Sequence, residues 1–242
     1  MGRFSVFSIV VLALQMTVLP GLASTNPDAH WAREKRSLAL DLGDNLSGSW
    51  DKFLRRASSE WSRADRVETR IVNGKTTGNL CKATEGRVEV CNAQYGQNGW
   101  LGVTTVWVDR GHIVQAVVKM NDSYFGSGEF DDPVAKRHTM CQEIGHSLGL
   151  DHTYHHTCMN DNQEAILDPA NDAPSARNLR ELERIYRHRD DETTVAQIDL
   201  APAFTAEESV APEPRAGKKR ERVIREQLGG NRQRITYVTW IS

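Results

Sequence analysis

The chain has 242 residues, a formal net charge of −2 and a mean hydropathy of −0.53. A chain of this length can form one domain of moderate size with flanking segments. Its charge is so close to zero that it gives no reason to expect a nucleic acid or an anionic membrane as partner. Composition therefore argues against a protein that binds polyanions.

The N-terminus is typical of a secretory signal peptide. Arg3 supplies the positive start, residues 4–19 are largely apolar, and small residues precede Ala23. We expect residues 1–23 to be removed by cleavage after Ala23, which leaves a secreted protein without stable membrane association. The competing interpretation is a retained anchor, for which the apolar run is slightly short.

Residues 24–48 are expected to form an N-terminal segment, and the chain is polar and helix-prone from 26 to 66. The main domain is predicted over 49–189, with a first helix at 49–57. Short β-rich runs follow at 67–72 and 87–90, and longer ones at 103–108 and 112–120 suit central strands.

His112 is expected to be a strand-start histidine rather than a metal ligand. Asn121 and Asp122 are expected to form a turn, with a calcium contact as the alternative.

A helix is predicted to begin at Pro133, because Asp132 is a good N-cap and proline is favoured at the first helical position. Gly149 allows the chain to leave this helix through a left-handed turn. Apolar residues at helical spacing form the core face of this helix. Three polar residues at steps of four lie on its other side: His138, Gln142 and His146.

The stretch from Cys141 to His152 reads Cys-Gln-Glu-Ile-Gly-His-Ser-Leu-Gly-Leu-Asp-His. Residues four apart share a helix face, so Gln142 and His146 can face one metal ion. Glu143 lies beside the first ligand position, where a carboxylate can accept a proton from a metal-bound water. The turn after the helix can return His152 as a third ligand. Three protein ligands and a water are typical of a catalytic zinc.

An amide oxygen is a weaker and harder ligand than imidazole, so Gln142 predicts weakened zinc binding and leaves calcium as an alternative. His155 or His156 could replace it as ligand, or both could be solvated loop residues. His138 lies one helical turn away, about 6 Å along the axis, which is too far to replace Gln142 while His146 stays bound.

In a secretory context the four cysteines are disulfide candidates, and four cysteines allow three pairings. Local spacing favours a Cys81–Cys91 disulfide, which would close a short hairpin loop, and a Cys141–Cys158 disulfide. The alternative is that Cys141 binds the metal in place of Gln142.

After this region, residues 176–188 have helical character with an apolar stripe. Residues 190–220 are acidic and rich in Pro and Ala in their first part, and we expect a flexible linker. Residues 221–242 form a tail, of which 235–241 alternates like a strand that docks on a sheet edge.

The Cys141–His152 stretch resembles the metzincin zinc endopeptidases, nearest to the matrixins, with Gln142 in place of the first histidine of their H-E-x-x-H signature. It is still more similar to secreted matrixin-like proteins that share the Cys-Gln-Glu helix. Met159 stands where a metzincin carries its Met-turn. The resemblance covers roughly residues 59 to 188, and further segments fit it at 86–92, 95–102, 121–125, 157–160 and 182–186.

The resemblance implies an α+β fold: a metzincin-like catalytic domain with a mixed twisted sheet, an active-site helix, a Met-turn and a C-terminal helix. It implies a monomeric zinc metalloendopeptidase that acts on peptides or proteins, with zinc on Gln142, His146 and His152 and with Glu143 as general base. A metzincin binds its substrate along one strand near the cleft, for which residues 113–120 are the best candidate. The alternative is a catalytically weak or inactive secreted protein that binds peptides or protein partners.

Overall fold

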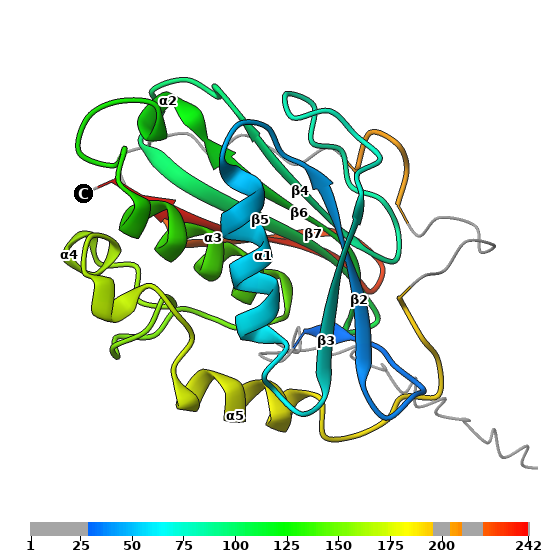
Figure 1. The fold of residues 1–242 in the computed structure, drawn as a ribbon. Coiled ribbons are helices and arrows are strands. Elements are labelled where there is room, and N and C mark those ends of the chain that lie inside the picture. The colour runs from blue at the N-terminus through cyan, green and yellow to red at the C-terminus, as the bar shows by residue number, and fades with distance from the viewer. Residues whose placement is uncertain (1–28, 196–203, 210–219, 242) are drawn as a thin grey trace, which may run out of the picture.

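The computed structural model describes residues 29–195, 204–209 and 220–241. The predicted signal peptide and the larger part of the predicted linker lie outside these residues. The described chain is α+β, with one mixed sheet and helices packed on it (Figure 1). None of the helices that the structure describes is long and apolar enough to cross a membrane.

The sheet has eight strands, seven of them in the order β3-β2-β4-β6-β5-β8-β7, and β1 pairs with the start of β6. The pairs β3–β2, β2–β4 and β4–β6 are parallel. The pairs β6–β5, β5–β8 and β8–β7 are antiparallel. The strands are β1 (His30–Trp31), β2 (Leu38–Asn45), β3 (Val67–Asn73), β4 (Val88–Ala93), β5 (Trp100–Asp109), β6 (His112–Asn121), β7 (Val223–Gly229) and β8 (Arg232–Trp240).

Strand β2 corrects the prediction that residues 26–66 are helix-prone throughout. Leu38, Leu40 and Leu42 alternate with less buried residues, and all three are completely buried. This period of two is the pattern of a strand. The predicted N-terminal segment therefore contributes a central strand to the sheet.

Two long helices, α1 (Trp50–Trp61) and α3 (Pro133–Ser147), cover the same face of the sheet (Figure 1). The indole nitrogen of Trp61 donates to the Cys141 carbonyl at 2.9 Å, which joins the two helices inside the core. The remaining helices are short or peripheral: α2 (Asp122–Phe125), α4 (Gln163–Ile166), the 3-10 turn Pro169–Asn171 and α5 (Ala176–Ile185).

Both favoured disulfides are present. Cys81 pairs with Cys91 and Cys141 with Cys158, each with a Cα–Cα distance of 5.9 Å. The alternative of Cys141 as a metal ligand is therefore wrong. Disulfides persist in oxidising compartments, so they agree with an extracellular protein.

The C-terminal residues complete the sheet. Strand β8 pairs with β5 along its whole length, and β7 forms the outer edge. Parts of the predicted linker also pack on the domain. Phe204 is buried, and Trp107 donates its indole proton to the Glu208 carbonyl at 2.7 Å. The tail and these linker segments thus belong to the folded domain.

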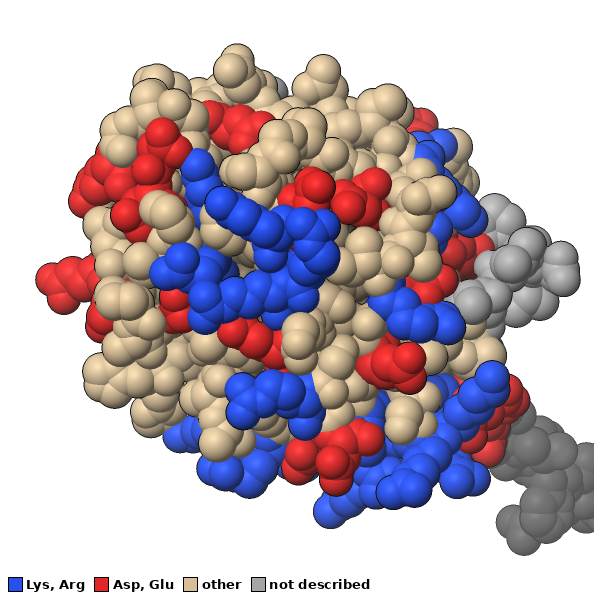
Figure 2. All heavy atoms as spheres, in the orientation of Figure 1, with Lys and Arg blue, Asp and Glu red and all other residues tan. Residues whose placement is uncertain are grey.

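The surface is mixed in charge. On the face that carries α1, Lys and Arg lie among Asp and Glu (Figure 2). Several of these groups form ion pairs, such as Arg56 with Glu60 and Asp172. Exposed pairs of this kind contribute about 1 kcal/mol or less each, so the fold depends on its core.

Candidate active site

Helix α3 begins and ends as its sequence predicts. The Asp132 carboxylate accepts from the backbone N–H groups of Val134 and Ala135, and Pro133 occupies the first turn. Gly149 has a φ of +98°, and a Cβ there would lie 2.4 Å from the Ala29 carbonyl oxygen. Glycine is required both for the left-handed turn and for this close approach.

The turn brings the two predicted histidine ligands together. The Nε2 atoms of His146 and His152 are 3.1 Å apart. The Nδ1 atom of His146 lies 2.7 Å from the Leu150 carbonyl oxygen. Because a carbonyl only accepts, Nδ1 carries the proton and the lone pair of Nε2 faces His152. A metal-binding histidine is oriented in the same way by a partner on its other nitrogen.

The other two predicted site residues, Gln142 and Glu143, meet at one hydroxyl. The Oγ1 atom of Thr239 lies 2.6 Å from Gln142 Oε1 and 2.6 Å from Glu143 Oε1. One hydroxyl proton can serve only one of these two acceptors. All three oxygens are satisfied when Glu143 carries a proton and donates it to Thr239, which in turn donates to Gln142.

Burial favours that protonated form. Glu143 is completely buried, and loss of hydration raises its pKa to about 8, although hydrogen bonds from Thr104 and Thr239 act in the opposite direction. Thr104, on β5, lies 2.6 Å from Glu143 Oε2. Burial and, secondarily, the proximity of His152 lower the pKa of His146, so its ring is neutral.

Strand β8 covers the site. The ring of Tyr237 stacks on His146, with centroids 4.3 Å apart and planes 6° from parallel. Gln142, Glu143 and His146 are all completely buried, so α3 has no solvent-facing side at these positions. The alternation of residues 235–241 predicted a strand, but no local signal indicated that Tyr237 and Thr239 would contact the site.

Strand β6, predicted to bind substrate, lies inside the sheet. Its residues pair with β4 on one side and with β5 on the other. The prediction is wrong because β6 has no free edge to which a peptide could add. The strand that borders the site is β5, which supplies Thr104, and its outer edge carries β8.

The alternative ligands do not reach the site in this structure. His155 and His156 are exposed, and His155 contacts Arg177 instead. The Oδ2 atom of Asp161 lies 3.9 Å from His152 Nε2, and Arg222 pairs with the same carboxylate at 2.9 Å.

The predicted turn after β6 is confirmed. Asn121 caps α2, accepting from the Ser123 N–H. The Asp122 carboxylate accepts from Trp50 Nε1 at 2.8 Å and also from the amide of Asn92. Both of its oxygens thus accept hydrogen bonds from neutral donors that fix the turn.

Met159 is buried and packs against the helix rather than projecting into solvent. A Cβ at Gly145 would lie 2.5 Å from its sulfur. The Cys141–Cys158 disulfide ties the preceding residue to α3. This part of the loop is therefore fixed directly against the helix that carries Gln142, Glu143 and His146.

No family model matches the chain, and no curated protein matches it either. The interpretation of the site therefore depends on its own residues and their geometry.

Proposed function

We propose that this chain is a secreted zinc-dependent metalloendopeptidase of the metzincin type, with zinc on Gln142, His146 and His152. The observation that carries the proposal is the pair of histidines. Zinc–nitrogen bonds of about 2.0–2.1 Å in a tetrahedron separate two ligands by about 3.3 Å. The Nε2 atoms of His146 and His152 are 3.1 Å apart, and His146 is already oriented by the Leu150 carbonyl.

The third donor fits a weaker site. Gln142 Oε1 accepts from Thr239 and, as an amide oxygen, has a second lone pair for a metal. Its Nε2 atom is buried and has no hydrogen-bond partner among the described residues. Such an unsatisfied donor costs about 1–3 kcal/mol, and exceptions of this kind call for a functional explanation.

Bound zinc would polarise the peptide carbonyl and acidify a water molecule. The positive charge of bound zinc would favour the ionised form of Glu143, which would accept the proton of that water on Oε1, the oxygen that now contacts Thr239. Thr104 fixes the other carboxyl oxygen and so orients Glu143. An extended peptide would add to the outer edge of β5, where its backbone would find the same partners as β8 does.

The occupation of the β5 edge by β8 supports a second candidate function. Because β8 occupies this edge and places Tyr237 and Thr239 over the site, a peptide can reach Glu143 only when β8 moves. A permanently closed site would be that of a secreted protein that is catalytically inactive and binds peptides or protein partners.

The test compares zinc content and cleavage of a quenched fluorescent peptide library in four proteins. These are the parent, His146→Ala, the opened double variant Tyr237→Ala/Thr239→Ala, and the opened variant with Glu143→Gln. We expect His146→Ala to lose one zinc per chain. We expect cleavage to rise in the opened variant and to disappear with Glu143→Gln while zinc is retained.

Zinc content that does not depend on His146 would overturn the metal centre. Zinc that does depend on His146, without cleavage by the opened variant, would support the inactive binding protein. Gln142→His adds a matched comparison, because imidazole is the stronger zinc ligand. Tighter zinc and faster cleavage in the opened variant are expected for an enzyme.

A further inference from the structure

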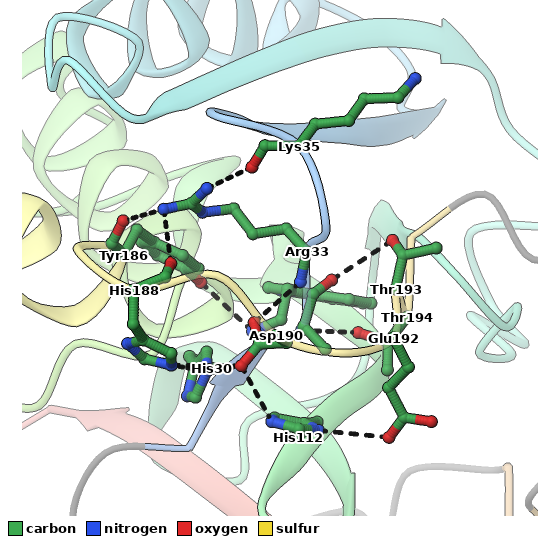
Figure 3. Close-up of polar contacts among 12 residues, drawn as sticks. His30, Arg33, Lys35, His112, Tyr186, His188, Asp190, Glu192, Thr193 and Thr194 are labelled. Atoms are coloured by element: carbon green, nitrogen blue, oxygen red, sulfur yellow. Dashed lines mark hydrogen bonds and ion pairs between the residues drawn. The ribbon is translucent and has the colours of Figure 1, made fainter.

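A second group of histidines, with no residue in common with the candidate active site, lies where β1, the start of β6 and the segment after α5 meet (Figure 3). His30, His112 and His188 all turn an Nε2 atom toward one oxygen of Asp190. We infer that these four side chains form a structural zinc site. The inference is independent of the proposed peptidase activity.

The distances between these side chains are compatible with ligands of one metal ion. Asp190 Oδ1 lies 3.5 Å from His30 Nε2, 3.5 Å from His112 Nε2 and 3.2 Å from His188 Nε2. A charge-assisted hydrogen bond is shorter, about 2.7–2.9 Å. Ligands of tetrahedral zinc are separated by about 3.3 Å.

The nitrogen atoms also lie close to one another. The Nε2 atoms of His30 and His188 are 3.1 Å apart. One ligand atom from each of His30, His112 and Asp190 lies within 4.8 Å of the others. With His188, whose Nε2 contacts both His30 and Asp190, three imidazoles and one carboxylate are available as zinc ligands. Nitrogen donors of this kind select zinc or a similar transition ion over calcium or magnesium.

Partners in the outer shell orient the ligands. Asp190 uses Oδ2 to accept from the Arg33 backbone N–H at 2.9 Å, which leaves Oδ1 facing the imidazoles. The carboxylate of Glu192 lies on the other side of the His112 ring, with Oε1 3.6 Å from Nδ1, while the Nε2 atom of His112 faces Asp190.

The segment that carries His188 and Asp190 is held by a buried arginine. The Arg33 guanidinium donates to the carbonyl of His188 at 2.7 Å and to that of Tyr186 (Figure 3). The Thr194 hydroxyl accepts from the Ala32 N–H at 2.9 Å. Residues 153 or more positions apart are thus aligned before any metal binds.

Such a site would brace the end of α3. Next to His30, Trp31 donates its indole proton to the Ser147 carbonyl at 2.8 Å. The Tyr186 hydroxyl donates to the Leu148 carbonyl at 2.9 Å. Both contacts hold the last turn of the helix, so metal binding at the cluster would stabilise the C-terminal part of α3.

The test measures zinc per chain by elemental analysis after equilibration with Zn²⁺ and desalting, and the melting temperature with and without Zn²⁺. The variants are His188→Ala and Asp190→Asn. His188 has a side chain that is 53% exposed, so its removal leaves the core intact. An asparagine at 190 can still accept from the Arg33 N–H. His155→Ala, which removes an exposed histidine outside the cluster, is the control.

We expect each cluster variant, but not the control, to lose one zinc or bind it at least about tenfold more weakly, together with the zinc-dependent rise in melting temperature. Zinc content and melting temperature that His188→Ala and Asp190→Asn leave unchanged would overturn the site. The two proposals fail separately. A zinc that is lost with His146→Ala belongs to the candidate active site, and one that is lost with Asp190→Asn belongs to the cluster.

Discussion

Single residues of α3 have protonation states that are set by burial. His138 is completely buried, and loss of hydration lowers its pKa to about 4. Glu143, one and a half turns later, has a pKa raised to about 8 for the same reason. Burial thus favours the neutral form of an acid and of a base alike. The helix carries less charge inside the protein than its sequence suggests.

We predict that His138 makes the folded state sensitive to acid. Its folded pKa is depressed, so between the ordinary value of 6.5 and about 4 the unfolded chain binds a proton that the folded chain does not. Stability from this group is complete above pH 6.5 and falls as the pH drops to about 4. The loss is at most about 3.5 kcal/mol, since one pKa unit corresponds to about 1.4 kcal/mol.

Urea unfolding of zinc-free protein at a series of pH values tests this prediction. His138→Leu should lose less stability than the parent between pH 6.5 and 4. His155→Leu, at an exposed position, should follow the parent. Equal pH slopes for the parent and His138→Leu would contradict the assignment of a neutral buried imidazole.

At the scale of elements, α3 packs against its neighbours more closely than side chains usually allow. At Gly145 a Cβ would lie 2.5 Å from the Met159 sulfur and 2.7 Å from Cζ2 of Trp61. At Gly102 of β5 a Cβ would lie 2.5 Å from Glu143 Oε1. Glycines therefore allow α1, β5 and the loop around Met159 to approach the helix. This close packing fixes the positions of the candidate site residues.

Gly145→Ala should destabilise the protein by roughly 1–2 kcal/mol, although alanine is intrinsically the better helix former by about 1 kcal/mol, because overpacking costs about 1–3 kcal/mol. Chemical denaturation measures the change. In a Met159→Ala background the penalty of Gly145→Ala should shrink, since one of the two clashing side chains is gone. An additive double mutant would show that Met159 is not the obstacle.

At the scale of the whole molecule, the last strands determine whether the β5 edge and the site are open. Trp100 and Val103 of β5 pack with Val238 and Trp240 of β8 in a small buried cluster, and Tyr237 and Thr239 cover the site. Successive residues of β8 thus point to opposite faces of the sheet: Val238 and Trp240 join the cluster, whereas Tyr237 and Thr239 face the site. Loosening β8 would expose a long apolar edge strand as well as the site.

We predict that Val238→Asp lowers stability by about 3 kcal/mol or more, because it buries an unpaired carboxylate in this cluster. Hydrogen exchange should lose protection in β5 and β8 together, and size-exclusion chromatography should show self-association. Gln227→Asp, on the exposed side of β7, is the control and should behave like the parent. Protection that is lost in β8 alone would contradict the role of β8 in covering β5.

The sequence by itself determined the features that depend on neighbouring residues. These are the limits of α3 between Asp132 and Gly149, the β-rich runs that form the strands from β3 to β6, and the two disulfides. Capping, alternation and short loops act over a few residues, so their signals are local. Strand β2 was missed, although its three leucines at alternate positions, separated by Ala39 and Asp41, carry the period of two of a strand.

Only the tertiary structure decided that strand β8 covers the candidate site and that the histidines of the second cluster come together. Thr239 lies 97 positions from Gln142, and His188 lies 158 positions from His30. Such contacts follow from the pairing of β8 with β5 and of β1 with β6. Strand pairing is chosen by the burial of whole faces across the sheet, which no spacing within one segment records.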